Sequence, residues 1–458
     1  MSGQLALGIA SIFAPLNSSM LAVALPSIRR DLSVGVGSVT ILVSAYLIAV
    51  AVCQPAGGRI GDAFGHLRTI RVGIVVLILF SVASAFAWDF PSLVAMRSLQ
   101  GISAALIMPN ASAYLRKTVD VERLGGVLGM NGAVISAGAA FGPVVGGLLL
   151  AVGDWRWLFA INLPLGLLSL LLILRLPVDA GRGRSFLTLD TISLAALLAW
   201  FTGITLIGNS LRLGVPALTV LAFLLVAAGT VVYGARYRRS GTGVVDLKLF
   251  QRRNYAVAAA GTALTNVVMY TTLIAMPLYF REIEGLGDGL IGLSLLAMSA
   301  AMVIISPFSG QLSDRLGARP LLAAVGVCLV ASPIGLAFAV GNAPLGVILG
   351  FLLLIGLGMG LISAPQSVMA LQAIPREIAG MASGTYSMMR YVGSVAGAAL
   401  IAGLLGSQAS SGEFGLLFAV LAAVGAINLV AGSFARPVRP EAALAPLPPA
   451  AVRAAPEG

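Results

Sequence analysis

The amino-acid sequence predicts an all-α membrane protein made of two similar halves. Three observations lead to this prediction: the composition is strongly apolar, apolar stretches of membrane-spanning length recur along the chain, and one short tract occurs twice. Hydrophobic residues make up 59% of the 458 residues and charged residues only 10%, whereas soluble domains have about 25% charged residues. The chain is therefore too apolar to fold as a soluble domain.

Fourteen apolar windows are long enough to cross a bilayer, because a helix of about 20 residues spans the hydrocarbon core. The first window is too long for a signal peptide and follows no basic residue, so we interpret it as a helix. The windows are 5–28, 38–57, 72–88, 91–114, 125–151, 157–176, 189–209, 214–235, 255–280, 289–309, 321–340, 344–368, 378–405 and 414–434.

Positive charges fall mainly on one side of these windows. Of the 28 Lys and Arg residues, 21 lie in segments on the side of the N-terminus, five lie on the other side, and Arg97 and Arg390 lie within windows. Basic segments of this kind are usually cytoplasmic, so a cell-membrane protein with both termini in the cytoplasm is predicted. The excess of basic residues in the cytoplasmic segments explains the formal charge of +11, and no nucleic-acid partner is expected.

The repeated tract divides the chain. GRIGDAFG at 58–65 recurs as GQLSDRLG at 310–317, with an offset of 252 between matching residues. Internal repeats are typical of secondary transporters, and this offset predicts six helices per half with the seventh and eighth inserted between them. The predicted parts are a first half (1–176), an inserted pair (177–236), a cytoplasmic linker (237–254), a second half (255–434) and a disordered tail (435–458).

Both copies of the tract combine glycines with one carboxylate. Glycine permits a tight turn, and a carboxylate at a helix junction can accept backbone N–H bonds or pair with arginine. We predict a latch that forms in one state and breaks in another; ordinary acidic loop residues are the alternative. The latch residues are Gly58, Asp62 and Gly65 in the first copy and Gly310, Asp314, Arg315 and Gly317 in the second.

The tract resembles the inter-helix signature of the major facilitator superfamily, in which Gly, Asp and Gly are followed by basic residues. The first copy departs from it, because Ala63, His66 and Leu67 stand where cations are usual. The resemblance implies latches at Asp62 and Asp314, the first of them weakened. We interpret His66, the only histidine, as a loop residue and not as a proton carrier.

The fourth window carries an arginine in the tract RSLQGISAA, with Arg97, Gln100 and Gly101. Arginine within a span is costly and rarely faces lipid, although one near a helix end can extend to the interface, which is the alternative. The tract resembles the superfamily's fourth-helix motif. The resemblance implies a role for Arg97 in proton coupling or substrate binding, and Gln100 is a candidate beside it.

The fifth window carries GAAFGPVVGG at 138–147, in which Gly138, Gly142 and Gly146 recur every four residues on one face. Pro143 removes a backbone hydrogen bond and favours a bend. Plain helix packing is the alternative. With Gly147, the string resembles the antiporter motif of exporters in the superfamily, which favours export over import.

The sixth window begins with DWRWLFAINLPLG at 154–166. Trp155 and Trp157 are typical of the aromatic belt at a membrane interface. The string also resembles the fourteen-helix drug:proton antiporter family, and with the helix count it identifies the chain as a member. The resemblance implies efflux of drugs or antibiotics in exchange for protons.

Asn17 is the main departure from that family. The tract LNSSMLAVALP at 16–26 matches the family's first-helix motif, but Asn17 stands where the family usually has Asp. Asn cannot titrate, and all 17 acidic residues fall in loops, at helix ends or in the tail. Three accounts stay open: Asp62 or another loop-proximal acid carries the proton, the substrate brings charge, or transport is independent of protons.

A central cavity is expected between the halves. Arg97 and Arg390 have no evident counter-ion, which favours an anionic or zwitterionic substrate. Other candidate lining residues are polar, aromatic or methionine side chains on helices that, by the resemblance, would line the pore of the superfamily, with structural hydrogen bonding or packing between helices as the alternative. They are Tyr46, Gln54, Asn110, Asn131, Asn266, Tyr270, Gln366, Tyr386 and Met389, with Met108, Met269 and Met388 as adaptable lining.

The predicted function is secondary active export of an amphiphilic drug, antibiotic or metabolite by alternating access, with proton antiport. One alternative is a proton-independent facilitator or exchanger for a small anionic or zwitterionic metabolite; another is a non-transporting membrane sensor. Cys53 and Cys328 are isolated, and no P-loop or HExxH motif occurs, so no cofactor, metal or enzyme activity is expected. The expected partners are the substrate, protons and the bilayer, and we expect a monomer.

Overall fold

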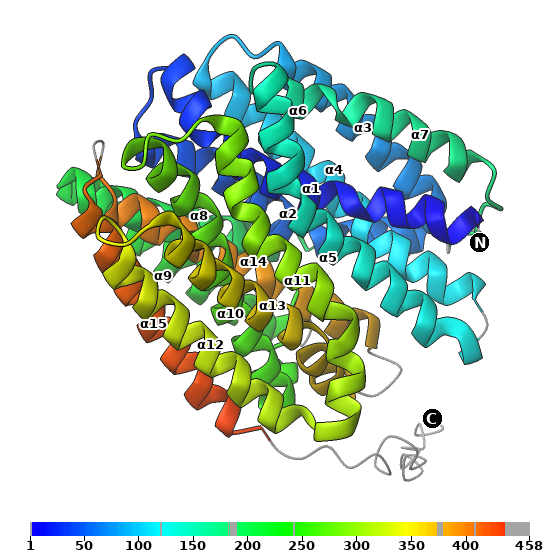
Figure 1. Cartoon of the computed structure of the whole chain (residues 1–458). Coiled ribbons are helices and arrows are strands. Elements are labelled where there is room, and N and C mark those ends of the chain that lie inside the picture. Colours follow the sequence, from blue (N-terminus) through cyan, green and yellow to red (C-terminus); the bar gives the residue numbers. More distant parts are fainter. Residues whose placement is uncertain are drawn as a thin grey trace, which may run out of the picture.

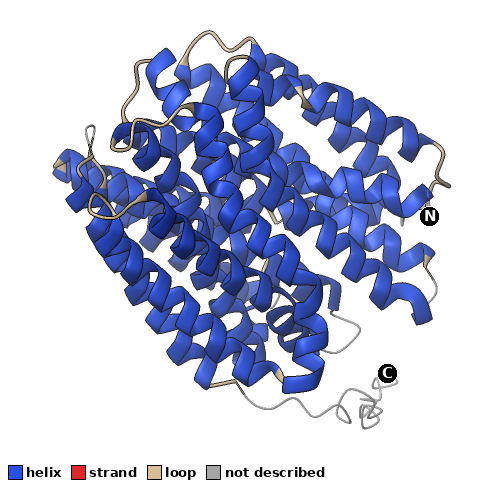
Figure 2. Cartoon of the chain, in the orientation of Figure 1, coloured by secondary structure: helices blue, strands red, loops and turns tan. Residues whose placement is uncertain are grey.

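The computed structural model describes residues 2–119, 121–181, 183, 190–240, 243–372, 379–406 and 409–435, and its regular elements there are all helices (Figure 2). Thirteen of these helical segments are long and apolar enough to cross a membrane. A shorter apolar stretch, Ala137–Val152, belongs to a further long helix. The all-α prediction is confirmed. Among the described residues, helix length and apolar composition identify thirteen candidate spans, whereas fourteen were predicted.

The first group of helices packs pairwise. Helix α1 lies against α5, both α2 and α3 lie against α4, and α3 also contacts α7. The predicted window 157–176 is divided into two helices at Ile161. The helices are α1 (Ser2–Asp31), α2 (Val36–Phe64), α3 (His66–Ala85), α4 (Phe90–Thr118), α5 (Val121–Val152), α6 (Trp157–Ala160) and α7 (Asn162–Leu174).

A second group repeats this pattern. Helix α10 lies against α14, both α11 and α12 lie against α13, and α12 also contacts α15. Its helices are α10 (Arg253–Glu282), α11 (Asp288–Leu316), α12 (Ala318–Ala339), α13 (Leu345–Gln372), α14 (Ala379–Leu404) and α15 (Ser411–Ser433).

Two helices lie between these groups in sequence, α8 (Thr191–Leu213) and α9 (Pro216–Ser240). They pack on each other, and α8 also contacts α2 and α14, one helix from each group. After α9 the chain folds back, because the Tyr233 hydroxyl bonds both the N–H and the carbonyl of Val245 at 2.7 Å. A 3-10 helix, η2 (Leu247–Gln251), then leads into α10, so much of the predicted linker is packed structure.

The repeated tract forms the same turn twice. Gly65 joins α2 to α3 with φ 97°, and Gly317 joins α11 to α12 with φ 81°. Residues with a side chain rarely adopt this backbone region, whereas glycine does so freely. The third glycine of each copy is therefore explained by backbone geometry.

The two groups meet along one seam (Figure 1). We call the end of the bundle where α1 begins the terminal end, and the opposite end the far end. The ribbons of the two groups approach each other toward the far end and diverge toward the terminal end. Large apolar side chains such as Leu79 and Phe338 are exposed on the outside, as expected for a bundle surrounded by lipid tails.

Candidate functional site

A chain of hydrogen bonds between polar side chains crosses the interior of the first group. Arg97 Nη1 donates to Gln100 Oε1 at 2.8 Å, and Gln100 Nε2 donates to Ser81 Oγ at 2.9 Å. Asn162 Nδ2 lies 3.2 Å from Ser81 Oγ and 2.6 Å from Asn17 Oδ1. All five side chains are buried. The structure thus joins three predicted site residues to two, Ser81 and Asn162, that sequence reasoning missed.

Asn17 is held by a reciprocal amide pair. Its Nδ2 donates to Asn162 Oδ1 and to the Phe13 carbonyl, both at 2.9 Å, while its own Oδ1 accepts from Asn162. An ionised carboxylate at this position would lose both donated bonds, because it only accepts. Asn162 belongs to the string 154–166 that resembles the antiporter family. A polar amide in an otherwise apolar helix is the sequence feature by which Asn162 could have been identified.

Arg97 is enclosed within the first group. Its guanidinium carbon lies 4.2 Å from the ring centroid of Tyr46 and 5.8 Å from that of Phe159, distances at which cation–π attraction operates. With 1% of its surface exposed, it does not extend to the interface, so that alternative is wrong. Its Nε and Nη2 have no hydrogen-bond partner among the described residues.

The middle of the seam is polar. Ser18 Oγ of α1 lies 2.9 Å from Tyr270 Oη of α10, which joins the two groups. Arg390 is half-buried in α14, and among the described residues its guanidinium makes no hydrogen bond or ion pair.

A small cavity lies beside Tyr270. Its volume is about 10 Å³, about what one water molecule requires, so the seam is closed at this point. Methionine dominates its lining, and thioether side chains adapt readily to different shapes. Met269 of α10 was predicted as a lining residue, whereas sequence reasoning missed the methionines that α11 and α13 contribute. The four methionines of the lining are Met269, Met298, Met302 and Met359.

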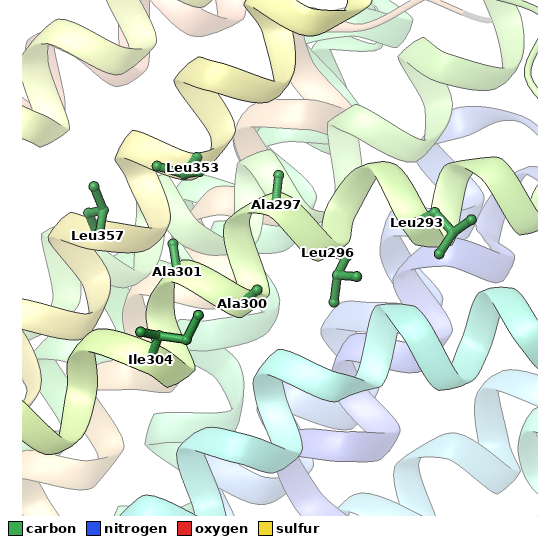
Figure 3. A pocket seen from close by; sticks show the side chains of 8 residues that line it. All are labelled: Leu293, Leu296, Ala297, Ala300, Ala301, Ile304, Leu353 and Leu357. Carbon is green, nitrogen blue, oxygen red and sulfur yellow. The ribbon is translucent and has the colours of Figure 1, made fainter.

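A larger groove of about 380 Å³ lies on the outside of α11 and α13 (Figure 3). Its lining consists of leucine, isoleucine and alanine side chains, several of them exposed, such as Leu293 and Ile304. Solute sites usually include a few polar groups that fix orientation. The groove therefore suits lipid acyl chains better than a specifically bound solute.

The small-residue face of α5 packs against α1. A Cβ atom added at Gly142 would lie 1.8 Å from Ser19 Oγ, and one at Gly146 would lie 2.9 Å from the Met20 carbonyl oxygen. Gly138 meets Ile12 in the same way, at 2.4 Å. These three glycines therefore let two helix backbones approach closely.

The end of the same string crosses the seam. A Cβ atom at Gly147 would lie 2.7 Å from Gly292 Cα of α11, and one at Gly292 would lie 3.0 Å from the Pro143 carbonyl oxygen. Helices α5 and α11 thus approach backbone to backbone, which only small residues permit. We call this contact the glycine seal.

Ionic contacts close the seam at the far end. Arg29 of α1 pairs with Glu282 of α10, and each side chain is 20% exposed. Ser27 Oγ lies 3.4 Å from Asp288 Oδ2, and Arg281 Nη1 lies 3.8 Å from Asp288 Oδ1. Residues at the ends of α1, α10 and α11 therefore join the two groups beside the glycine seal.

The two tryptophans of the family string differ in position. Trp155 is buried and donates from Nε1 to Asp31 Oδ2 at 2.9 Å, and Arg156 lies 4.2 Å from its ring centroid. Trp157 is exposed. Of the two, only Trp157 fits the predicted interfacial belt.

The first latch lies at the terminal end, away from the central network. His66 is the buried first residue of α3, not a loop residue. Its Nε2 lies 3.5 Å from Asp62 Oδ1, and its Nδ1 lies 2.7 Å from Asn110 Oδ1. Asn110 Nδ2 donates to the Gly57 and Leu106 carbonyls, so its Oδ1 must accept. His66 Nδ1 is therefore assigned as the hydrogen-bond donor to Asn110, and Nε2 faces Asp62.

Asp179 fastens the segment after α7 to this junction. Its carboxylate accepts from the backbone N–H groups of His66 at 3.0 Å and Leu67 at 2.9 Å, and Lys117 Nζ lies 3.3 Å away. Burial raises the pKa of Asp179. These hydrogen bonds lower it by more than burial raises it, so the pKa lies below its ordinary value. A carboxylate at a helix N-terminus is favoured in the same way.

Replacing Asp179 by asparagine should destabilise the junction at neutral pH. Hydrogen bonds to charged groups contribute about 1.5–3 kcal/mol, and we expect a loss at the lower end of that range. Because the folded pKa is depressed, this contribution is present above the unfolded value of about 3.9 and disappears as the pH falls through the folded value. Thermal unfolding of wild type and Asp179→Asn between pH 3 and 7 should therefore converge at the acid end; a constant difference would contradict this.

The predicted cavity residues of the second group form a separate network. The Thr262 hydroxyl lies 2.9 Å from Gln366 Oε1 and 2.8 Å from Tyr386 Oη. Asn266 Nδ2 donates to the Thr262 carbonyl at 2.8 Å. Met389 is half-buried in α14. These residues pack α10, α13 and α14 together.

The remaining predicted residues are dispersed. Gln54 is buried in α2, and its Oε1 has no partner among the described residues. Arg315 is exposed in the last turn of α11, after Gly310. The side chains of Asn131 and Asp314 lie outside the described residues, as does the predicted tail beyond Ala435.

Comparison with known proteins places this architecture in a family. The family model described as Major Facilitator Superfamily matches residues 7–398. The multidrug resistance protein Stp of Mycobacterium tuberculosis is 31% identical over 412 residues, covering 88% of this chain and 75% of Stp. The tetracenomycin C resistance and export protein of Streptomyces glaucescens is 29% identical, covering 88% of this chain and 76% of that protein.

Other similar proteins are named for the transport of different substrates. The riboflavin transporter RibZ of Clostridioides difficile is 27% identical, covering 84% of this chain and 83% of RibZ. The partially occluded inward open structure of the xylose transporter XylE from E. coli has a TM-score of 0.66 at 14% identity, covering 94% of this chain and 96% of that one. The family model, the relatives and the helical architecture agree, and the chain belongs to the major facilitator superfamily, whose members are multi-pass membrane transporters.

Proposed function

We propose that this protein exports amphiphilic small molecules from the cytoplasm by alternating access. The observation that carries the proposal is the seam: the glycine seal and the Arg29–Glu282 pair hold the two groups together at the far end, while their ribbons diverge at the terminal end. A carrier that is closed on one side in this manner delivers its cargo by opening there. The glycine string of α5 and the names of two relatives, for multidrug resistance and for antibiotic export, favour the outward direction.

The proposed layout has two six-helix halves with α8 and α9 inserted, and the parts 1–176, 177–236, 237–254, 255–434 and 435–458. It is supported by the repeated packing pattern of the two groups and by the matching turns at Gly65 and Gly317. Ser18 and Tyr270 are also 252 residues apart, the offset of the repeated tract, so their contact joins equivalent positions of the two halves. In this proposal both termini are cytoplasmic and the far end is extracellular.

Proton antiport is the proposed coupling, and proton-independent exchange is the second candidate. Asn17 favours the second, because it occupies the family's carboxylate position and is fixed as an amide by Asn162. The riboflavin transporter among the relatives supports a metabolite as possible cargo. Asp62 remains the first carboxylate to test for antiport.

Uptake into everted vesicles, which corresponds to export from the cell, distinguishes the two couplings. A panel of anionic, neutral and cationic amphiphiles should be followed with an imposed pH gradient and again after an ionophore collapses it. Flux that stops with the gradient supports antiport, and flux that ignores it supports exchange. The absence of flux for every compound, with the protein correctly inserted, would contradict the proposed function.

Asn17→Asp is expected to make transport depend more strongly on the pH gradient. The new carboxylate would sit where Asn162 Nδ2 already donates at 2.6 Å, in the interior where a charged acid readily takes up a proton. The ratio of flux with and without the gradient should rise relative to wild type, with Asn17→Ala as the control that removes the amide without adding an acid. An unchanged ratio in Asn17→Asp would show that position 17 does not participate in coupling.

A further inference from the structure

The middle of the seam carries positive charge that the described residues do not neutralise. We propose that the exported compound bears a carboxylate that binds between Arg97 and Arg390, with its apolar body in the methionine-lined cavity beside Tyr270. This inference rests on the proposed export function and names the chemical class of its substrate.

Arg97 presents a complete binding edge. Its Nη1 is engaged by Gln100 at 2.8 Å, whereas Nε and Nη2 have no partner among the described residues although the side chain is only 1% exposed. Nε–H and one N–H of Nη2 lie in the guanidinium plane along the same edge. One carboxylate can therefore accept from both, which is the bidentate geometry in which arginine binds carboxylates most strongly.

The surrounding charge favours an anion. Arg390 makes no ion pair with a described residue, and the next residue of α14, Tyr391, meets α4 across the seam, with its Oη 3.5 Å from Met108 Sδ. All 17 acidic residues of the chain lie in loops, near helix ends or in the tail. A buried cation without a counter-ion is costly, so a bound carboxylate would supply the missing charge.

Neutral hydroxyl groups complete the head-group site. The Tyr46 ring centroid lies 4.2 Å from the Arg97 guanidinium carbon. Tyr270 Oη lies 2.9 Å from Ser18 Oγ across the seam, and Tyr391, next to Arg390 in the sequence, has its Oη 3.5 Å from Met108 Sδ of α4. Tyrosine hydroxyls can donate to a carboxylate oxygen without adding charge. They come from α2, α10 and α14, so a single ligand would contact both sides of the seam.

The apolar body has an adjacent space. Tyr270 also lines the cavity that contains Met269, Met298, Met302 and Met359. At about 10 Å³ this cavity is nearly closed, so a ligand must displace flexible methionine side chains. Entry would also separate Ser18 from Tyr270, 2.9 Å apart across the seam, which links binding to movement of the halves.

Binding of three matched probes tests the inference. 4-Phenylbutyrate, 4-phenylbutanol and 4-phenylbutylamine share one apolar body and differ in the head group. Their affinities should be measured by calorimetry on the purified full-length protein in lipid nanodiscs. We expect wild type to bind the acid at least about tenfold more tightly than the alcohol, equivalent to about 1.4 kcal/mol, and to bind the amine most weakly.

Variants connect the preference to the two arginines. Arg97→Gln should abolish the preference for the acid over the alcohol, and Arg97→Lys should retain only part of it, because lysine cannot bind bidentately. Arg390→Gln should reduce it independently, which keeps the test decisive if Arg97→Gln does not fold. Arg238→Gln, at an exposed position in α9, is the matched control and should leave it unchanged.

Three results would overturn the inference: equal binding of acid and alcohol by wild type, a preference for the amine, or an acid preference that survives both Arg97→Gln and Arg390→Gln. The proposed function fails separately. If the acid binds as expected but no compound is transported into everted vesicles, the head-group site stands and the export proposal is wrong.

Discussion

Replacing Gly147 by valine should lower export at least about tenfold while the amount of inserted protein stays at the wild-type level. A Cβ atom at this position would lie 2.7 Å from Gly292 Cα across the seam, so the far end could not close as it does here. Overpacking a tight contact costs about 1–3 kcal/mol, and about 1.4 kcal/mol corresponds to a tenfold change in an equilibrium. Because the clash lies between the two groups, it should act on the conformational equilibrium more than on folding.

Initial rates of uptake into everted vesicles, which correspond to export from the cell and are normalised to inserted protein, provide the measurement. Gly350→Val is the matched control, because Gly350 lies within α13, is exposed and has no atom within 4 Å of an added Cβ. It should retain wild-type export. Wild-type export by Gly147→Val would show that the α5–α11 contact is not needed during the cycle.

Reversing the charge at Glu282 should shift the far end from its closed toward its open state. Glu282→Arg would place two arginines together where Arg29 now pairs with a carboxylate. Breaking a buried pair costs about 3–5 kcal/mol, whereas exposed pairs contribute about 1 kcal/mol or less. The pair is 20% exposed on each side, so we expect a shift between these limits, roughly tenfold to a hundredfold in the ratio of open to closed molecules.

Spin labels at the far end can measure this shift by electron resonance. Gly35→Cys and Gly346→Cys provide exposed sites on opposite groups with no atom within 4 Å of an added Cβ, after Cys53 and Cys328 are replaced by serine. The distance distribution should lengthen in Glu282→Arg and return when Arg29→Glu is added. If the double exchange fails to restore the short distance, the ion pair does not hold the far end closed.

The elements of the fold were largely predictable because they depend on local sequence. Apolar length alone predicts a spanning helix, and the observed helices occupy the predicted windows. The break at Ile161 between α6 and α7 was missed, since the window 157–176 is uniformly apolar. Gly65 and Gly317 were predicted as turn residues, and their positive φ angles confirm the physical reason, which lies in the backbone.

The candidate site was predictable only in part. Arg97 and Gln100 were identified because a charge within an apolar window is conspicuous, and they do lie together. Asn110 and Asp62 were grouped with them but lie at the terminal end beside His66. Sequence reasoning could assign residues to helices, but it could not give the depth and facing of each side chain.

The sequence by itself determined the membrane-protein class, the helices, the repeat and the glycine turns, because each follows from composition, local periodicity or backbone conformation. Tertiary structure alone decided the partners of Asn17, Trp155 and Asp179. These lie 145, 124 and 112–113 residues away along the chain. Contacts at such separations depend on how helices pack, and packing chooses among many polar groups that look alike in the sequence.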